Sequence, residues 1–318
     1  MTAKAGRGAV GRFEAMVLEN DHARAVILPE LGGRVWELED RARGRQWIWH
    51  RDDITLEAHP VGSSYDDVWA GGWEELFPND AAGEFEGRAL PDHGEWWASP
   101  WSATVSTDAT GASVSLSLRT KVIEADCRKV YTLSHDEPTL SVRYTIHALE
   151  TKPFHFLLKQ HLPVAITSDC RLILPGGRAE AVDPNFGTLL EDDEPFAWPA
   201  ATGPGSPVDM RLIPARSSQA REFVYVRDLT AAWCGVDDLA ANASLRMHFD
   251  SGALPFVWLF LTYGGWRDLY TAVLEPCTNM PKDLSEAVRL GQSAVLDPGS
   301  EFTTGVEVEL TSLRETPA

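Results

Sequence analysis

Two segments of this chain place ionisable side chains where acid–base chemistry needs them. The segment 154–161 reads FHFLLKQH, and as a strand it carries Lys159 and His161 on one face, because side chains alternate along a strand. Burying both groups costs free energy unless they have polar partners or a wet cavity. The alternatives are an exposed strand face, or a helix that pairs His155 with Lys159.

The second segment, 268–275, reads DLYTAVLE and ends with Glu275 on an otherwise apolar strand face. Apolar neighbours raise the pKa of a carboxyl group, which suits a general base. The commoner alternative is a strand-terminal glutamate that reaches solvent. A histidine, His93, lies in PDHGEWW beside Asp92, which could orient the imidazole toward a substrate oxygen. Otherwise it is an ordinary loop histidine.

Tryptophans gather in the first third of the chain, among glycine, asparagine and acidic residues. Flat apolar faces beside fixed polar groups are what a neutral sugar needs. The pattern therefore predicts a sugar-recognition wall, with Trp73 and Trp97 as candidate contacts, although the same rings could simply cap sheet edges. Of the 12 tryptophans, those in this region are Trp36, Trp47, Trp49, Trp69, Trp73, Trp96, Trp97 and Trp101.

Other chemistries find little support in the sequence. It contains no G-x-S-x-G, P-loop or G-x-G-x-x-G motif. His93 and Glu95 form H-x-E, but no second histidine follows at a metal-binding spacing, so we expect no metal and no cofactor. The adjacent Glu74 and Glu75 would suit a glycosidase only if they flanked a bond.

Short alternating runs bounded by Gly, Pro and acidic turns predict the elements that hold these residues. Strands are expected at 113–118, 140–146 and 301–310, and one short helix at 282–290. Strands without intervening helices predict an all-β fold, a large antiparallel β-sandwich. We expect a single domain over residues 1–318, with a loop-rich insertion near 181–214.

Composition narrows the partners. The formal charge of −19 over 318 residues leaves no basic stripe for nucleic acid or an anionic membrane. The longest apolar run, 256–263, is too short to cross a bilayer, and the N-terminus shows no signal-peptide pattern. Four scattered cysteines without C-x-x-C spacing suit a reducing cytoplasm. We expect a cytoplasmic monomer or homodimer that binds a small sugar.

Taken in order, several motifs resemble the aldose 1-epimerase (galactose mutarotase-like) superfamily. Each is loose alone, but together they span most of the chain, and the family fold is a large β-sandwich often called a supersandwich. The matching segments are ILPELGGRVWELED from 27, GGWEELFPN from 71, PDHGEWW from 91, LLKQHLPVAI from 157, LEPCTNMPKDL from 274 and VLDPGSEFTTGVEVEL from 295.

The resemblance implies interconversion of the α and β anomers of a free or modified monosaccharide, without a cofactor. One group removes the proton of the C1 hydroxyl and another protonates the ring oxygen, so that the ring opens and can close on either face. By this resemblance Glu275 is the base and His161 the acid. The sugar would be held by His93, Asn79 and Lys159, with Arg88 as a candidate for a charged substituent.

Two departures leave the sugar open. The Gly-Arg…Asn-Arg segment and the two-histidine-plus-aromatic motif of galactose mutarotases are missing, so galactose is not implied. A further acidic site residue of the family has no clear match, and Asp209, Asp237 and Asp250 are the candidates. A non-catalytic carbohydrate-binding protein on the same fold is the main alternative. An enzyme requires His161 and Glu275 to face one another across a pocket about one sugar ring wide, and placement on opposite faces of the sheet would exclude it.

Overall fold

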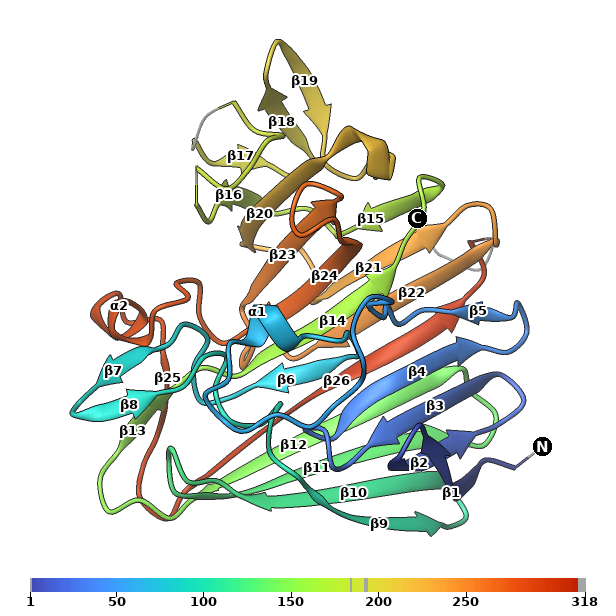
Figure 1. Cartoon of the computed structure of the whole chain (residues 1–318), viewed down its shortest axis with the longest axis vertical. Coiled ribbons are helices and arrows are strands. Elements are labelled where there is room, and N and C mark those ends of the chain that lie inside the picture. The colour runs from blue at the N-terminus through green and yellow to red at the C-terminus, as the bar shows by residue number, and fades with distance from the viewer. Residues whose placement is uncertain (1, 184, 192–193, 314–318) are drawn as a thin grey trace.

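Antiparallel strands form most of the regular secondary structure, and the larger sheets have eight, seven and five strands (Figure 1). The computed structural model describes residues 2–183, 185–191 and 194–313. The eight-stranded sheet has the order β15 (Cys170–Ile173), β21 (Trp233–Asp238), β22 (Ala243–Phe249), β26 (Glu301–Thr311), β12 (Thr139–Ala148), β11 (Ala125–Ser134), β10 (Gly111–Arg119) and β9 (Ser102–Thr107).

The seven-stranded sheet carries most of the candidate site. Its order is β17 (Phe196–Ala197), β16 (Arg178–Ala181), β20 (Ala220–Arg227), β23 (Phe256–Tyr263), β24 (Tyr270–Cys277), β14 (Lys159–Ala165) and β6 (Glu74–Leu76). The five-stranded sheet is formed in sequence order by β1 (Lys4–Val10), β2 (Phe13–Glu19), β3 (Ala23–Leu28), β4 (Arg34–Asp40) and β5 (Arg45–Gln46).

Small elements complete the described chain. Three two-stranded pairs join β13 (Phe154–Phe156) to β25 (Ala294–Leu296), β18 (Ala200–Gly203) to β19 (Ser206–Asp209), and β7 (Gly83–Phe85) to β8 (Arg88–Leu90). The helices are α1 (Tyr65–Val68), α2 (Leu284–Arg289) and the 3₁₀ turn Arg216–Ser218. In Figure 1, α1 lies in front of the seven-stranded sheet, near β14 and β24. Among the described residues, no helix combines the length and the apolar character needed to cross a membrane.

The main core lies between the sheets, because the long strands bury alternate side chains. In β12, Leu140, Val142, Tyr144 and Ile146 are buried, whereas Arg143 between them is exposed. These side chains form one apolar cluster with residues of all three sheets. This alternation is the signal on which the predicted strands rested, and the predicted all-β sandwich is confirmed.

Strand β14 is buried on both of its faces, as is its neighbour β24. Leu162 and Val164 belong to the main core. Lys159 and His161 lie on the opposite face, where the rings of Tyr65 and Trp69 cover His161. Charged and titratable groups on this strand are therefore withdrawn from water by segments that pack over the sheet, rather than by the core itself.

The structure refines the predicted elements locally. The segment 154–161, expected to be one strand, divides into β13 and β14, because Leu157 N donates to Pro78 O (2.7 Å) and Leu158 N to Thr278 Oγ1 (3.0 Å) instead of to a neighbouring strand. The expected helix is α2, capped by Asp283. The loop-rich segment near 181–214 contains β17, β18 and β19 among its described residues.

A buried ion pair ties two sheets together inside the main core. Lys129 of β11 contacts the Glu75 carboxylate of β6, and it also donates to Gly32 O at 2.9 Å. Tyr144 donates to the second oxygen of Glu75 at 2.7 Å. Burial lowers the pKa of Lys129, and the Glu75 carboxylate opposes that shift. Each charge therefore depends on its partner.

We predict that Lys129→Met lowers the free energy of unfolding by about 3–5 kcal/mol, because it leaves the Glu75 carboxylate buried and uncompensated. Urea unfolding followed by tryptophan fluorescence measures this loss. The double variant Lys129→Met/Glu75→Gln should recover part of it, since no net charge then remains buried. Equal losses in the single and double variants would contradict this account.

Candidate functional site

One row of side chains crosses the seven-stranded sheet on the face opposite the main core. In the strand register, Glu74 of β6 is paired with His161 of β14, and Glu275 of β24 is paired with Trp258 of β23. The pairing of β14 with β24 places His161 beside Glu275, and Tyr225 of β20 is paired with Trp258. Side chains opposite one another in adjacent strands share a face, so acid, base and aromatic groups are neighbours here.

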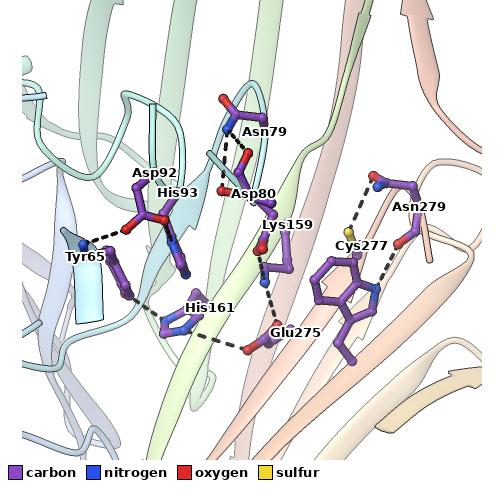
Figure 2. A network of polar contacts seen from close by, with 12 residues as sticks. Tyr65, Asn79, Asp80, Asp92, His93, Lys159, His161, Glu275, Cys277 and Asn279 are labelled. Atoms are coloured by element: carbon purple, nitrogen blue, oxygen red, sulfur yellow. Dashed lines mark hydrogen bonds and ion pairs between the residues drawn. The ribbon is translucent and has the colours of Figure 1, made fainter. Parts of the chain in front are cut away.

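At the centre of the row, two carboxylates converge on one lysine (Figure 2). His161 Nε2 lies 3.7 Å from Glu275 Oε1, and Lys159 Nζ lies 2.8 Å from Glu275 Oε2. Lys159 also forms an ion pair with Asp80 and lies 4.0 Å from the centre of the Trp258 ring. Lys159 and Glu275 are almost fully buried. The ammonium group therefore has carboxylate partners on two sides and an aromatic face on a third.

A second histidine approaches the row from the loop after β8. His93 Nδ1 lies 2.8 Å from Asp92 Oδ1, while Asp92 Oδ2 accepts from the backbone N–H of Tyr65 at 2.8 Å. The His93 ring stacks on the ring of Tyr65, with centroids 4.0 Å apart. Asp92 therefore fixes the imidazole and the start of α1 together, as the sequence suggested for the adjacent acid. The His93 side chain is 19% exposed, against 7% for His161.

Tyr65 also connects His161 to a carboxylate behind it. Its hydroxyl donates to Glu74 Oε1 and lies 3.2 Å from His161 Nδ1. Arg34 forms an ion pair with Glu74 Oε2 at 2.8 Å. Because a carboxylate only accepts, the tyrosine proton is directed to Glu74, and His161 Nδ1–H donates to the tyrosine oxygen. This leaves His161 Nε2 facing Glu275 as the atom that can gain or lose a proton.

Burial dominates the electrostatics of the row. It raises the pKa of Glu275, with the Lys159 ammonium opposing the shift. It also lowers the pKa of His161 well below its usual range, and Lys159 and His93 add to that shift. Burial alone would lower the pKa of His93, but Asp80 and the hydrogen bond to Asp92 outweigh it, so the pKa of His93 is raised. The two histidines therefore differ in proton affinity.

The loop that carries His93 is held at both ends. Asn79 Nδ2 donates to Ala81 O (2.9 Å) and Pro91 O (2.7 Å). Gly94 has a φ of 72°, and a side chain there would meet Phe77 O at 2.2 Å, so only glycine fits. His93 itself has a φ of 59°. A non-glycine residue in this region costs on the order of 1–3 kcal/mol and is found preferentially at functional sites.

Four of the residues selected from the sequence meet in this cluster: His93, Lys159, His161 and Glu275. Two other residues selected from the sequence, Asn79 and Trp97, hold the segments next to the cluster in place. Asn79 braces the loop through its amide nitrogen. Trp97 packs edge-on against Tyr65 (5.0 Å between centroids) and donates to Asp92 O at 3.2 Å.

Two predicted contacts lie elsewhere. Trp73 precedes Glu74 and so points to the opposite face, where it is fully buried and donates to Gln160 Oε1 at 3.0 Å. Arg88 forms an ion pair with Glu150 at 2.7 Å. Neither side chain joins the cluster, and we leave both out of the site.

Several residues of the site were not selected from the sequence. Asp80 is the acidic side chain that shares Lys159 with Glu275. Of the candidates, Asp209 forms an ion pair with Arg211 (2.7 Å), Asp237 lies in the eight-stranded sheet and Asp250 follows β22. The sequence could have indicated Asp80, because it directly follows the predicted site residue Asn79. Tyr65 had no comparable signal, because it lies in a helix of four residues.

The cluster holds an acid, a base and hydrogen-bond donors, so it is equipped to move protons. No group of three or more His, Cys, Asp or Glu side chains in the described part of the chain is arranged to hold a metal ion. The Lys159 contact favours the charged form of Glu275, and the adjacent imidazole can exchange a proton at Nε2. General acid–base catalysis requires such a pair within reach of the same substrate atoms.

Comparison with known proteins supports the fold. No protein-family model matches the sequence. A Klebsiella pneumoniae structure provisionally named an aldose 1-epimerase superposes with a TM-score of 0.73 at 12% identity, over 97% of this chain and 83% of that one. A galactose mutarotase-like protein of Clostridium acetobutylicum superposes with a TM-score of 0.70 at 12% identity, over 98% of this chain and 99% of that one. The Slr1438 protein of Synechocystis sp. PCC 6803 superposes with a TM-score of 0.69 at 16% identity, over 94% of this chain and 96% of that one.

We predict that Lys159→Met raises the pKa of Glu275 further, because it removes the ammonium group that opposes the effect of burial. The carboxyl ¹³C shift of Glu275, followed through a pH titration of glutamate-labelled protein, measures it directly. Lys152→Met, which removes an exposed lysine, is the control and should leave the titration unchanged. A lower Glu275 pKa in Lys159→Met would show that another group sets its proton affinity.

Proposed function

The chain has the galactose mutarotase-like fold, and we propose that it is an aldose 1-epimerase that interconverts the α and β anomers of a free or modified monosaccharide. The observation that carries the proposal is the contact between His161 Nε2 and Glu275 Oε1, 3.7 Å apart on one face of the sheet. The sequence predicted that these two side chains share a face and lie across a pocket about one sugar ring wide. They share the face, but at 3.7 Å they are in direct contact rather than a ring's width apart. Similarity to proteins named as mutarotases supports the fold on which this chemistry would take place.

The reaction suits two groups that are direct neighbours. The C1 hydroxyl oxygen and the ring oxygen are both bonded to the anomeric carbon, so their partners need to flank one carbon rather than a whole ring. The base takes the proton of the C1 hydroxyl, the C1–ring-oxygen bond breaks, and the acid protonates the ring oxygen to give the open aldehyde. Rotation about C1–C2 and the reverse steps close the other anomer.

We assign Glu275 as the base and His161 as the acid. The Lys159 ammonium favours the ionised form of Glu275, which can accept the proton of the C1 hydroxyl. With its Nδ1–H directed to Tyr65, His161 would have to bind a second proton at Nε2, as an imidazolium, before it could deliver that proton to the ring oxygen. His93, oriented by Asp92, would hold a sugar hydroxyl and is the second candidate for the acid, because its pKa is raised whereas that of His161 is lowered.

A carbohydrate-binding protein without catalysis is the alternative on this fold. Under that alternative the aromatic and hydrogen-bonding groups would persist, but the proton-transfer groups would be dispensable. We place the protein in the cytoplasm, a proposal that its four unpaired cysteines, all buried, support. Whether it acts as a monomer or a homodimer stays a prediction.

We predict that wild-type protein accelerates anomer exchange of at least one aldose in a panel of glucose, galactose, mannose and xylose. Glu275→Gln and His161→Asn should each lower kcat by about 10²–10⁴-fold, the usual contribution of a general base or acid. Saturation-transfer NMR measures the exchange rate. His93→Asn should mainly raise KM.

The reverse pattern, with kcat lost in His93→Asn and KM raised in His161→Asn, would assign the acid to His93. Equal exchange rates for wild type and Glu275→Gln would remove Glu275 from the mechanism. Binding without acceleration for every sugar would favour the carbohydrate-binding alternative.

The pH profile gives an independent test. Because Glu275 must be ionised to act as a base, we predict that kcat/KM rises with pH through the Glu275 pKa, which burial raises above 4.5. The acid limb of the profile should therefore lie above pH 4.5. It should move to higher pH in Lys159→Met. An enzyme that keeps full activity below pH 4.5 would need a base other than Glu275.

A further inference from the structure

We propose that Glu74 stores the proton that His161 delivers: through the Tyr65 hydroxyl it moves the imidazole between its two neutral tautomers, so that Nε2 gives or takes a proton without His161 becoming charged. This inference rests on the proposed function, because it takes His161 for the acid. Glu74 and Tyr65 touch no substrate atom in this scheme. They are positioning residues, which decide on which nitrogen the imidazole carries its proton.

Glu74 and Glu75 are adjacent in the sequence but point to opposite faces of β6. Glu75 forms the ion pair of the main core, whereas Glu74 is paired with His161 on the face of the proposed acid and base. The Glu74 side chain is fully buried, and its ionic partner is Arg34. Glu74 is therefore a second buried carboxylate on the site face, on the side of His161 away from Glu275.

A hydrogen-bonded chain, which we call the relay, runs from Glu74 through Tyr65 to His161. The Tyr65 hydroxyl donates to Glu74 Oε1 and lies 3.2 Å from His161 Nδ1 (Figure 2). Tyr65 is only 1% exposed, and the Tyr65 and Trp69 rings meet the imidazole edge-on at 5.5 and 5.1 Å between centroids. The relay is therefore closed to solvent at Nδ1 and exchanges protons at Nε2.

Each transfer along the relay can be balanced by the next. When Glu74 carries a proton, the Tyr65 hydroxyl donates to His161 Nδ1 and the imidazole carries its proton at Nε2. As Nε2–H protonates the ring oxygen of the sugar, the tyrosine proton moves to Nδ1 and the Glu74 proton moves to the tyrosine oxygen. Glu74 is then ionised and Nδ1–H donates to Tyr65, as in the structure. Ring closure reverses the three transfers, and neither a tyrosinate nor an imidazolium forms.

The surroundings of His161 disfavour an imidazolium. Burial lowers the pKa of His161 well below its usual range. Three cationic or protonatable side chains add to that shift: Lys159, His93 and Arg34. The carboxylate that faces Nε2 at 3.7 Å is Glu275, and Lys159 already engages it at 2.8 Å. A second proton on the imidazole would therefore be a buried positive charge near other cations.

The surroundings of Glu74 make its carboxyl group the better place for that proton. Burial raises the pKa of Glu74, and the Glu75 carboxylate adds to the shift. Arg34, the Tyr65 hydrogen bond and Lys129 oppose the shift without cancelling it. Arg34 stays partnered when Glu74 is neutral, because two backbone carbonyls accept from the guanidinium at 3.0 and 2.9 Å. A proton on Glu74 therefore removes a buried charge, whereas one on the imidazole adds a charge.

Imidazole ¹⁵N shifts in histidine-labelled protein test the relay without any sugar. They distinguish the Nδ1–H tautomer, the Nε2–H tautomer and the imidazolium, and the His161 signals are those missing in His161→Asn. On acidification we expect wild-type His161 to change from the Nδ1–H to the Nε2–H tautomer. Tyr65→Phe, which keeps the ring and removes the hydroxyl, should instead form the imidazolium, at lower pH. A wild-type imidazolium, a tautomer that stays unchanged down to acid unfolding, or the same tautomer change in Tyr65→Phe would overturn the proposal.

Kinetics give a second test with any sugar that the protein accelerates. Glu74→Gln and Tyr65→Phe should each lower kcat about 10²-fold, the lower end of the contribution of a general acid, and leave KM unchanged. The double variant should lose no more than either single variant, because the relay works as a unit. The fall of kcat at high pH should move to lower pH in both single variants, since the acid must then be an imidazolium.

Tyr131→Phe is the matched control, because Tyr131 is equally buried and its hydroxyl donates to Gly33 O at 2.7 Å in the main core. It should lower the free energy of unfolding and leave kcat and the His161 tautomer unchanged. Additive losses in the double variant, or a raised KM at unchanged kcat, would overturn the relay while the roles of His161 and Glu275 stand. If no sugar is accelerated, the proposed function fails, and the tautomer change still decides whether Glu74 stores the proton.

Discussion

The antiparallel register that places β14 between β6 and β24 is the constraint on which the site depends. It sets His161 between Glu74 and Glu275 on one face and Gln160 beside Glu75 on the other. A shift of one residue would turn every side chain of the strand to the opposite face. His161 would then enter the apolar core, and Leu162 would take its place beside Glu275. Because both faces of β14 are buried, each polar group on it must find a partner.

Two lysine–carboxylate systems lie on opposite faces of the same sheet, and their surroundings give them different roles. Lys129 and Glu75 lie between the sheets, where Tyr144 and Gly32 O complete their hydrogen bonds. Lys159 and Glu275 lie on the outer face beside His161. Buried ion pairs are seldom needed for stability, since apolar side chains of similar volume often do as well. A charged pair next to an imidazole with a free nitrogen is more readily explained by chemistry.

Sequence periodicity predicted the β-sandwich and the shared face of Lys159 and His161, because alternation is a local property that one strand displays by itself. Neighbours from distant segments were harder to foresee. Asp80, Tyr65 and Arg34 reach the site through loop conformations and a four-residue helix, which leave no periodic trace. The prediction that Trp73 contacts the sugar was wrong for a different reason. Its composition-based assignment to the sugar wall ignored the pleat, which directs it away from its neighbour Glu74 and into the core.

Most tryptophans of the tryptophan-rich segment therefore pack in the core or around the site residues, rather than offering a ring on which a sugar can stack. Trp73, Trp96 and Trp101 belong to the main core, while Trp69 and Trp97 line His161 and Tyr65. The half-exposed rings come instead from β20, β23 and the segments beside them. These strands follow β24 in the sheet order although β20 is far from β14 in the sequence. The frame therefore fixes His161 and Glu275, whereas the half-exposed rings lie one and two strands beyond Glu275 on the same sheet face.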